Sequence, residues 1–304
     1  IRGRLQLLIL MFISSLNKNF LLKILSLFSV VRGYNVIFIA FAQLVSSIFI
    51  FSTSNNILNI ILDLNIWLII FSSSTSISAG YIINNFYDSE KDLINRPLKT
   101  LLENEISGKT KLSAYVFLNT LTLFFSVLVS LKALLFFSFY TLVIFIYSIK
   151  LSRFLFIRNF LSVVLVITPF FAITVYYKNF SLEIFTHAIF LFFVILIKEL
   201  IKDLENLKGD FTMNYKTIPV VYGERKAKMF ITLYSLFVIS TCMNLISNYE
   251  IYLMKFYYIL SILFFIPFIY LLWNFNHKKY YEILHNSLKI LIVAGLFSII
   301  LHGF

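Results

Sequence analysis

Charged residues are scarce in this sequence: they make up 13% of its 304 residues, whereas 60% are hydrophobic and 18% aromatic. A soluble domain of ordinary composition carries about 25% charged residues, so this class of protein is excluded. Proline and glycine are also rare, at four and eight, which leaves long apolar runs uninterrupted. Only helices and closed barrels span lipid, and the runs do not alternate every second residue as barrel strands would. They therefore predict membrane-crossing helices.

Cysteine is nearly absent. The single Cys242 lies inside an apolar run, which excludes an intrachain disulfide and leaves the compartment undecided. The N-terminal segment has no small-residue cleavage site, so we expect no cleavable signal peptide.

The apolar runs predict an all-α, polytopic membrane helical bundle of about nine transmembrane helices. Residues 1–32 are interrupted by basic residues and are expected to form an interfacial N-terminal segment. Residues 33–304 are expected to form a single transmembrane domain. The expected spans are 34–51, 64–83, 112–131, 133–149, 159–177, 182–201, 229–247, 252–273 and 287–303.

The basic residues orient this bundle. Alternating nine spans leaves only Lys132, Lys178 and Lys255 of the 26 Lys and Arg on one side. By the positive-inside rule, the basic side and the N-terminus are cytoplasmic. The net charge of +12 is thereby explained by topology and by contact with anionic membrane lipids, and nucleic-acid binding is disfavoured.

Two acidic clusters follow the second and sixth spans, on the same predicted face. In "YIINNFYDSEKDLINRP" (81–97), Asn84, Asp88 and Asp92 recur every four residues and so share one face of a helix. In "KELIKDLENLKGD" (198–210), the pairs are Glu199 with Asp203 and Asn206 with Asp210. Like charges at this spacing repel unless a cation lies between them, and carboxylate and amide oxygens suit Mg²⁺.

Either cluster alone is typical of a solvated loop at a membrane exit. Two clusters with the same spacing on one face favour a site where Mg²⁺ holds a diphosphate. Basic residues near both clusters could neutralise the remaining phosphate oxygens, although each alone is equally typical of positive-inside topology. These residues are Arg96, Lys99, Lys150, Arg153 and Arg158.

The motifs resemble those of the UbiA superfamily of intramembrane prenyltransferases. Asn84, Asp88, Asp92 and Asn95-Arg96-Pro97 match the first family motif, NDxxDxxxD followed by NRP. Lys202, Asp203, Glu205, Gly209 and Asp210 match the second, KDxEDxxGD, in the form found in the lipid-synthesising branch. The segments "VRGYN" and "YKTIPVVYGERKA" (215–227) also look like family sequence, and the resemblance covers most of residues 30–230.

The resemblance implies a Mg²⁺-dependent enzyme that takes a polyprenyl diphosphate as donor. It implies catalytic roles for Asp88, Asp92, Asp203 and Asp210. The implied metal ligands are Asn84, Asp88 and Asp92 for one ion and Asp203, Asn206 and Asp210 for the other. The implied substrate-binding residues are Arg32, Asn35, Asn84, Arg96, Lys99, Lys150, Arg153 and Lys202.

Asparagine stands at two positions, Asn85 and Asn206, where the family usually has aspartate. We expect both changes to reduce the negative charge of the metal site. A second departure is Leu98-Lys99-Thr100 after NRP, where the family often continues with another RP, and this leaves the substrate less closely assigned.

The acceptor is open at this point. The second motif favours geranylgeranylglycerol phosphate, and an aromatic acceptor of the 4-hydroxybenzoate or naphthoate type is the alternative. A transporter is disfavoured because the acids lie at span ends rather than mid-span, and an inactive family member is a further alternative. No obligate protein partner is evident.

The four histidines are too dispersed in sequence to predict a metal site, and His187 is expected to be an interfacial residue.

Overall fold

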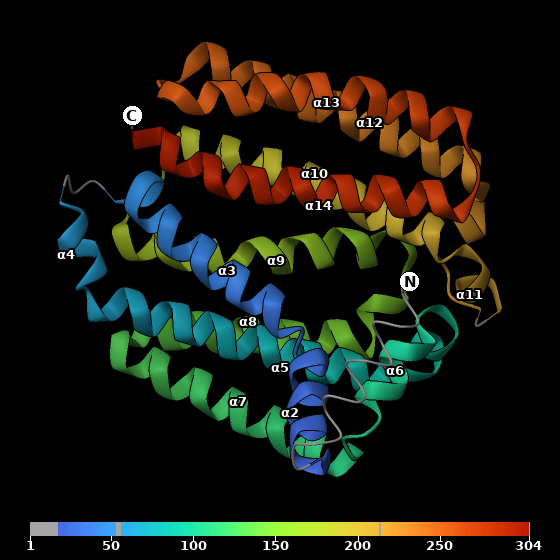
Figure 1. Cartoon of the computed structure of the whole chain (residues 1–304). Helices are drawn as coiled ribbons and strands as arrows, with labels where there is room; N and C mark the ends of the chain where they lie inside the picture. The colour runs from blue at the N-terminus through green and yellow to red at the C-terminus, as the bar shows by residue number, and fades with distance from the viewer. Residues whose placement is uncertain (1–17, 53–55, 213, 304) are drawn as a thin grey trace.

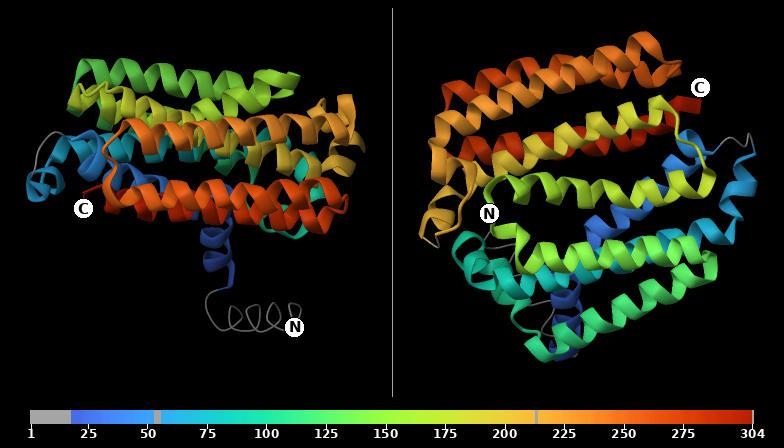
Figure 2. Two further views of the ribbon diagram at one scale, coloured as in Figure 1. Left: turned by 90° about the horizontal axis from the view of Figure 1, so that it is seen from above. Right: turned by 180° about the vertical axis from the view of Figure 1, so that it is seen from behind.

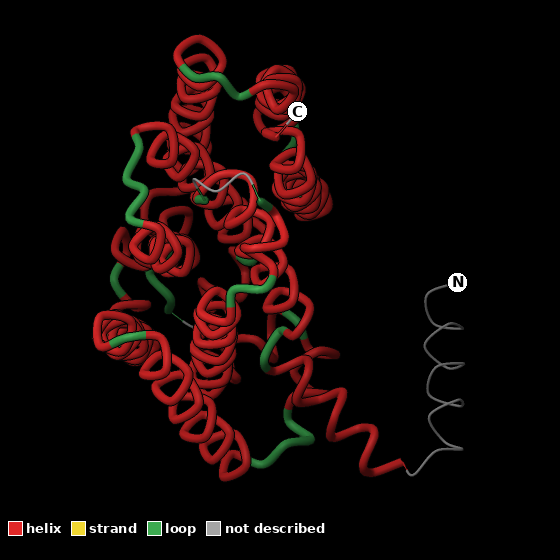
Figure 3. The backbone as a smooth tube through the Cα atoms, turned by 90° about the vertical axis from the view of Figure 1, so that its left-hand side faces the viewer, coloured by secondary structure: helices red, strands yellow, loops and turns green. Residues whose placement is uncertain are grey.

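The computed structural model describes residues 18–52, 56–212 and 214–303, and this part of the chain consists of helices and loops, as Figure 3 shows. It contains nine helices long and apolar enough to cross a membrane. The predicted all-α membrane bundle is therefore confirmed. The long helices lie side by side (Figure 1). Their bounds are α3 Gly33–Ser46 continued by η1 Ser47–Phe51, α5 Leu64–Asn95, α7 Gly108–Val129, α8 Leu131–Ile149, α9 Leu155–Tyr177, α10 Leu182–Glu205, α12 Ile218–Asn248, α13 Lys255–Asn274 and α14 Lys278–Ser298.

Shorter helices gather at the two ends of the bundle. Figures 1 and 2 show α6 (Pro97–Glu103) and α11 (Leu207–Thr212) at one end, and α4 (Ile57–Ile61) with the C-terminus at the other. The remaining short elements are η2 (Leu151–Arg153), η3 (Tyr252–Met254) and η4 (Ile299–Gly303). The two acidic motifs and the N-terminal helix lie at the α6 and α11 end.

Helix α2 (Lys18–Val30) stands away from the layer of long helices (Figure 2, left). Arg32 adopts a left-handed conformation with φ of 49° and separates α2 from α3. The Ser26 hydroxyl donates to the Leu102 carbonyl at 2.6 Å, so α2 is fastened to α6. The predicted interfacial segment covers α2, and its first 17 residues lie outside the described part of the chain.

Several helices extend well beyond their predicted spans. α5 continues to Asn95 rather than residue 83, α12 begins at Ile218 rather than 229, and α14 begins at Lys278 rather than 287. Hydropathy locates the lipid-facing part of a helix and misses its charged extension into the interface. Within α12, Gly223 takes a φ of 83°, which marks a kink between a short first segment and the span proper.

Two main apolar clusters hold the bundle together. One is built from α10, α12, α13 and α14 around Leu200, Ile231 and Phe265. The other joins η1, α5, α8, α9 and the start of α10 around Phe137 and Ile173.

A proline in α9 is accommodated by side chains of its neighbours. Pro169 has no N–H to donate to the Leu165 carbonyl one turn earlier. The Tyr140 hydroxyl donates to that carbonyl instead, at 2.8 Å, and Gln43 donates to the Pro169 carbonyl at 3.0 Å. Backbone groups inside a membrane must be satisfied by the protein itself, so α9 keeps its hydrogen bonds despite the proline.

Candidate active site

The first acidic motif lies on the last turns of α5. Asn84 Nδ2 donates to Asp88 Oδ2 at 3.1 Å, as expected for residues four apart on one face. The other Asp88 oxygen accepts from the Tyr215 hydroxyl at 3.1 Å. Burial, followed by the nearby Asp88 charge, raises the pKa of Tyr215 to about 12. The phenol therefore stays protonated and donates to the carboxylate at neutral pH.

The second acidic motif is centred on Asp203, which is 1% exposed near the end of α10. Arg158 Nη2 donates to Asp203 Oδ1 at 3.0 Å, and Asn159 Nδ2 donates to Asp203 Oδ2 at 3.0 Å. Both donors lie near the start of α9. A buried carboxylate is tolerated when it is paired and hydrogen-bonded in this way.

The two motifs meet directly at their ends. A methyl group added at Gly209 in α11 would collide with the carboxamide of Asn95, the last residue of α5. Tyr215, which follows α11, then reaches back to Asp88. The absence of a side chain at Gly209 allows this close approach, and the packing brings residues more than a hundred positions apart into one site.

A polar cavity of about 60 Å³ lies between the motifs. Glu199, one of its lining residues, is 3.2 Å from Lys202 Nζ and 3.3 Å from Lys198 Nζ. Arg158 Nη1 is buried there without a hydrogen-bond partner among the described residues. The cavity is lined by Asn84, Asp88, Tyr147, Ser152, Arg158, Asn159, Ser162, Glu199, Lys202 and Tyr215.

A much larger apolar pocket, of about 560 Å³, lies between the two main clusters. Its lining includes Tyr81, three residues before Asn84 on α5, and Lys198, next to Glu199 on α10. Asn35 and Lys289 also line it, whereas most of its wall is aliphatic and aromatic. The site thus combines a small cavity of charged and polar groups with a large neighbouring apolar pocket.

A model of the UbiA prenyltransferase family matches residues 36–290 of this chain. The chain belongs to that family.

Curated relatives of this UbiA chain include digeranylgeranylglyceryl phosphate synthases. The protein from Thermococcus gammatolerans is 33% identical over 155 residues, which are 51% of this chain and 55% of the relative. The protein from Saccharolobus solfataricus is 30% identical over 202 residues, covering 63% and 67%. The matches thus span between about half and two thirds of these relatives.

Solved structures agree with the fold. One, concerned with digeranylgeranylglyceryl phosphate synthase in membranes, superposes with a TM-score of 0.69 at 20% identity, covering 92% of this chain and 98% of that one. A UbiA homologue from Archaeoglobus fulgidus, bound to GPP and Mg²⁺, gives 0.65 at 15% identity, covering 90% and 99%. These structures establish the UbiA fold of the chain.

Five of the residues that the sequence patterns singled out line the polar cavity, namely Asn84, Asp88, Arg158, Glu199 and Lys202. Asp203 lies directly behind two of its lining residues, Arg158 and Asn159. Asp210 is fully buried, and Asn206 is 9% exposed at the end of α10.

Arg32 and Asp92 belong to the same neighbourhood. The Arg32 guanidinium lies 4.8 Å from the centre of the Tyr81 ring. Burial opposes the charged form of Arg32, but Tyr81, Asp92 and Glu199 outweigh it, so the pKa of Arg32 is raised.

Other predicted residues lie apart from the polar cavity. Lys150 is exposed just before η2 and Arg153 is exposed at its end, and Arg96 is the C-cap of α5. Lys99 Nζ lies 3.2 Å from Glu103 Oε1, and burial lowers the pKa of Lys99. Asn35 lines the apolar pocket instead.

Asn85 does not face the polar cavity. Its side chain donates to Glu103 Oε2 at 2.9 Å and accepts from Lys111 Nζ at 2.8 Å. The expectation that Asn85 reduces the charge of the metal site is therefore not supported by its contacts. The change from the family's aspartate instead alters a buried group beside Glu103.

Five lining residues were missed by the sequence analysis. Asn159 is a polar residue in the first turn of a span, which is a weak but usable signal, and Tyr215 falls just past the second motif. No pattern in the sequence distinguishes the other three, which are Tyr147, Ser152 and Ser162. The five missed residues are thus Tyr147, Ser152, Asn159, Ser162 and Tyr215.

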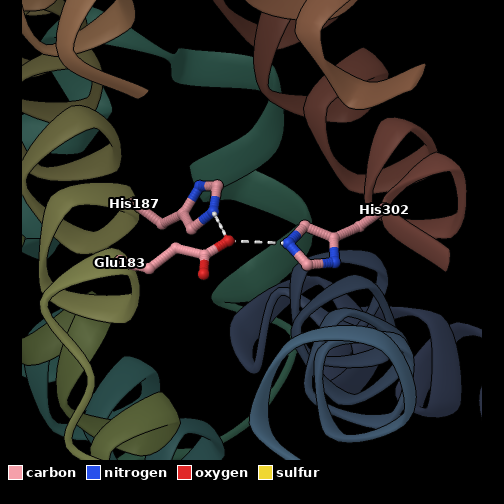
Figure 4. Close-up of side chains that lie close together, drawn as sticks. All are labelled: Glu183, His187 and His302. Atoms are coloured by element: carbon pink, nitrogen blue, oxygen red, sulfur yellow. Dashed lines mark hydrogen bonds and ion pairs between the residues drawn. The ribbon is translucent and has the colours of Figure 1, made fainter. Parts of the chain in front are cut away.

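The prediction that the histidines are dispersed is wrong for two of them. η4 brings His302 against His187 and Glu183 at the start of α10 (Figure 4). The His187 side chain is only 11% exposed, so it lies inside the bundle. Residues more than a hundred positions apart become neighbours here because α14 packs against α10 and leads directly into η4.

Proposed function

We propose that this chain transfers a polyprenyl group from a prenyl diphosphate to a membrane-associated acceptor, namely geranylgeranylglycerol phosphate. The observation that carries the proposal is the pairing of a charged cavity, lined from both motifs, with an adjoining apolar pocket of about 560 Å³. The diphosphate fits the first and the isoprenoid chain fits the second.

The residues around the polar cavity fit Mg²⁺ and a diphosphate. Asn84, Asp88 and Asp92 would hold one ion, and Asp203, Asn206 and Asp210 the other, because hard cations take oxygen ligands. Asp203 would use lone pairs that Arg158 and Asn159 leave, since a carboxylate has about four. Bound Mg²⁺ would offset the negative charge of the leaving diphosphate.

Cationic groups of the chain complete the binding of the diphosphate. Arg158 keeps a buried Nη1 without a partner among the described residues, so a phosphate oxygen in the cavity would satisfy it. Lys202 Nζ, now held by Glu199 at 3.2 Å, can contact a second oxygen. These fixed donors would stabilise charge that grows on the diphosphate as its bond to the allylic carbon breaks.

The reaction replaces one C–O bond by another. The acceptor hydroxyl oxygen bonds to the allylic carbon, the bond from that carbon to the diphosphate oxygen breaks, and the hydroxyl proton passes to solvent or to the released diphosphate. The apolar pocket keeps water from the cation-like carbon, which would otherwise be hydrolysed.

The relatives support a lipid acceptor over an aromatic one, because they include several proteins named digeranylgeranylglyceryl phosphate synthase. To test this, the purified protein is incubated with labelled geranylgeranyl diphosphate, Mg²⁺ and either geranylgeranylglycerol phosphate or 4-hydroxybenzoate. We expect a diether product with the first acceptor, measured by mass spectrometry, and none with the second. Product only with the aromatic acceptor would overturn the assignment.

The acidic residues have a matched control on the same helix. Asp88→Asn and Asp92→Asn should abolish transfer, because they remove charge from the metal site without removing packing. Glu90→Gln should leave it unchanged, since Glu90 is exposed and lies outside the lining of the cavity. Normal turnover in both aspartate variants would refute the metal site.

The active-site face is proposed to be cytoplasmic, on the basis of the basic residues that gather there. Cysteines placed at Ser89 and Lys208 should be labelled from the cytoplasm and one at Asn56 from outside. The native Cys242 is fully buried and gives little background. Labelling of Ser89 and Lys208 from opposite sides would contradict a shared site.

A further inference from the structure

A cluster of metal-ligating side chains lies at the end of the bundle opposite the acidic motifs. Glu183 and His187 lie one turn apart on α10, and His302 reaches them from η4 (Figure 4). Glu183 Oε1 is 2.8 Å from His302 Nε2 and 3.7 Å from His187 Nε2. One ligand atom from each residue lies within 4.8 Å of the other two. The three groups therefore point at a common centre.

Nε2 of His187 is joined to Glu183 only by a long ion-pair contact of 3.7 Å. The His187 side chain is 11% exposed, and Nε2 has no hydrogen-bond partner among the described residues. A polar atom buried without a partner costs about 1–3 kcal/mol. Something further is needed at the centre of the cluster to satisfy it.

The other ring nitrogen of His187 indicates what that is. Nδ1 lies 2.5 Å from the hydroxyl of Tyr258, which is 1% exposed. If Nδ1 donates to this hydroxyl, Nε2 presents a lone pair to the centre of the cluster. The opposite tautomer would aim an N–H at Glu183 across 3.7 Å, which is too long for a hydrogen bond. A histidine that donates one nitrogen to an oxygen and directs the other at a shared centre is the arrangement of a metal ligand.

We propose that Glu183, His187 and His302 form a zinc site that is separate from the magnesium site. Two imidazoles and a carboxylate are typical zinc ligands, whereas Mg²⁺ prefers oxygen alone. Ligands about 2.1 Å from a tetrahedral zinc ion are roughly 3.4 Å apart. The distances of 2.8 and 3.7 Å bracket this value, so small side-chain movements would admit the ion.

The zinc ion would also have a structural consequence. His187 lines the apolar pocket eleven residues before Lys198, which lines it near the polar cavity. At 1.5 Å per helical residue, the two lie about 16 Å apart along α10. Zinc would fasten η4 to α10 and close the far end of this pocket. Its fourth coordination position would be taken by water.

The test uses the full chain, purified with an affinity tag that contains no histidine, stripped with a chelator and equilibrated with buffered Zn²⁺ in excess Mg²⁺. We expect about one zinc per chain by elemental mass spectrometry. Co²⁺ in place of zinc should give the visible absorption of a tetrahedral site with nitrogen ligands. A wild-type protein that binds neither ion would overturn the proposal and leave a metal-free ion-pair network as the explanation of the cluster.

Variants locate the ion. Glu183→Gln and His302→Gln should each lower zinc affinity at least tenfold, because each removes one of three protein ligands. His277→Gln is the matched control, since His277 is exposed at the start of α14. Zinc binding that survives in both cluster variants would refute the assignment. If a cluster variant fails to fold, the wild-type stoichiometry and cobalt spectrum still decide.

The magnesium site is tested separately. Asp88→Asn should retain zinc while losing transfer, so failure of the proposed function and failure of the zinc site give different results. Loss of zinc from Asp88→Asn would place the bound ion at the acidic motifs and overturn the proposal.

Discussion

The contact between Gly209 and Asn95 predicts that the effect of Gly209→Ala on stability depends on the side chain at position 95. A methyl group at position 209 would collide with the Asn95 carboxamide. Overpacking costs about 1–3 kcal/mol, and the lower end applies because the colliding atoms end a short side chain that can rotate. Gly209 lies within α11 without a positive φ, so alanine also gains about 0.5–1 kcal/mol of helix propensity. The two effects nearly cancel, and stability should change little in the wild-type background.

The same substitution should be stabilising once Asn95 is shortened. In an Asn95→Ala background the collision is absent and only the gain of about 0.5–1 kcal/mol remains. The coupling between the two positions is therefore expected to be about 1 kcal/mol. This corresponds to a difference of roughly 2 °C in the midpoint of thermal unfolding, measured in detergent for the four proteins of the cycle.

Activity should respond more strongly than stability. Displacing Asn95 separates the ends of the two motifs, so Gly209→Ala should lower transfer severalfold at subsaturating Mg²⁺. Gly108→Ala is the control, because its methyl group would meet Phe86 at 3.5 Å, an ordinary contact. A coupling energy below about 0.3 kcal/mol is within the range of independent sites. Such a value, together with unchanged activity, would refute the proposal that the contact between Gly209 and Asn95 holds the two motifs together.

Three further predictions follow from the same geometry. Tyr215→Phe removes the donor to Asp88 and should lower kcat/KM about fivefold, the equivalent of roughly 1 kcal/mol, in steady-state assays; an unchanged value would contradict the contact. Asn206→Asp should lower the Mg²⁺ concentration for half-maximal activity severalfold, since a charged ligand adds about 1 kcal/mol; if Asn206 is no ligand, the buried charge will instead lower the unfolding temperature. Glu103→Gln should destabilise the protein by about 2 kcal/mol because Glu103 is 2% exposed and accepts from three side chains, whereas the exposed Glu105→Gln should melt like wild type.

The fold was largely predictable because lipid imposes a strong constraint on sequence. Nine apolar runs became nine helices suited to cross a membrane. The helix ends were not predictable from hydropathy, and the twelve residues from 84 to 95 show why. Most of them are polar, yet they continue α5 as helix, because this part of α5 contacts α6, α7 and α11.

The site was predictable only in part. Repetition every four residues identified Asn84 and Asp88 correctly as neighbours. It could not tell that the adjacent Asn85 turns to Glu103, because the direction of a side chain depends on which helix packs beside it. His187 and His302 met through the packing of the last span, and nothing in their spacing of 115 residues indicated this.

The proline in α9 also constrains how this protein can change over generations. Tyr140 supplies the hydrogen bond that Pro169 cannot, so the two positions share one task although they lie on different helices. Replacing Tyr140 first would leave the Leu165 carbonyl without a hydrogen-bond donor in the membrane interior. Replacing Pro169 first would restore the backbone hydrogen bond, so that the Tyr140 hydroxyl is no longer needed. The order of the two substitutions therefore matters, and we expect a lineage to lose the proline before the tyrosine becomes free to vary.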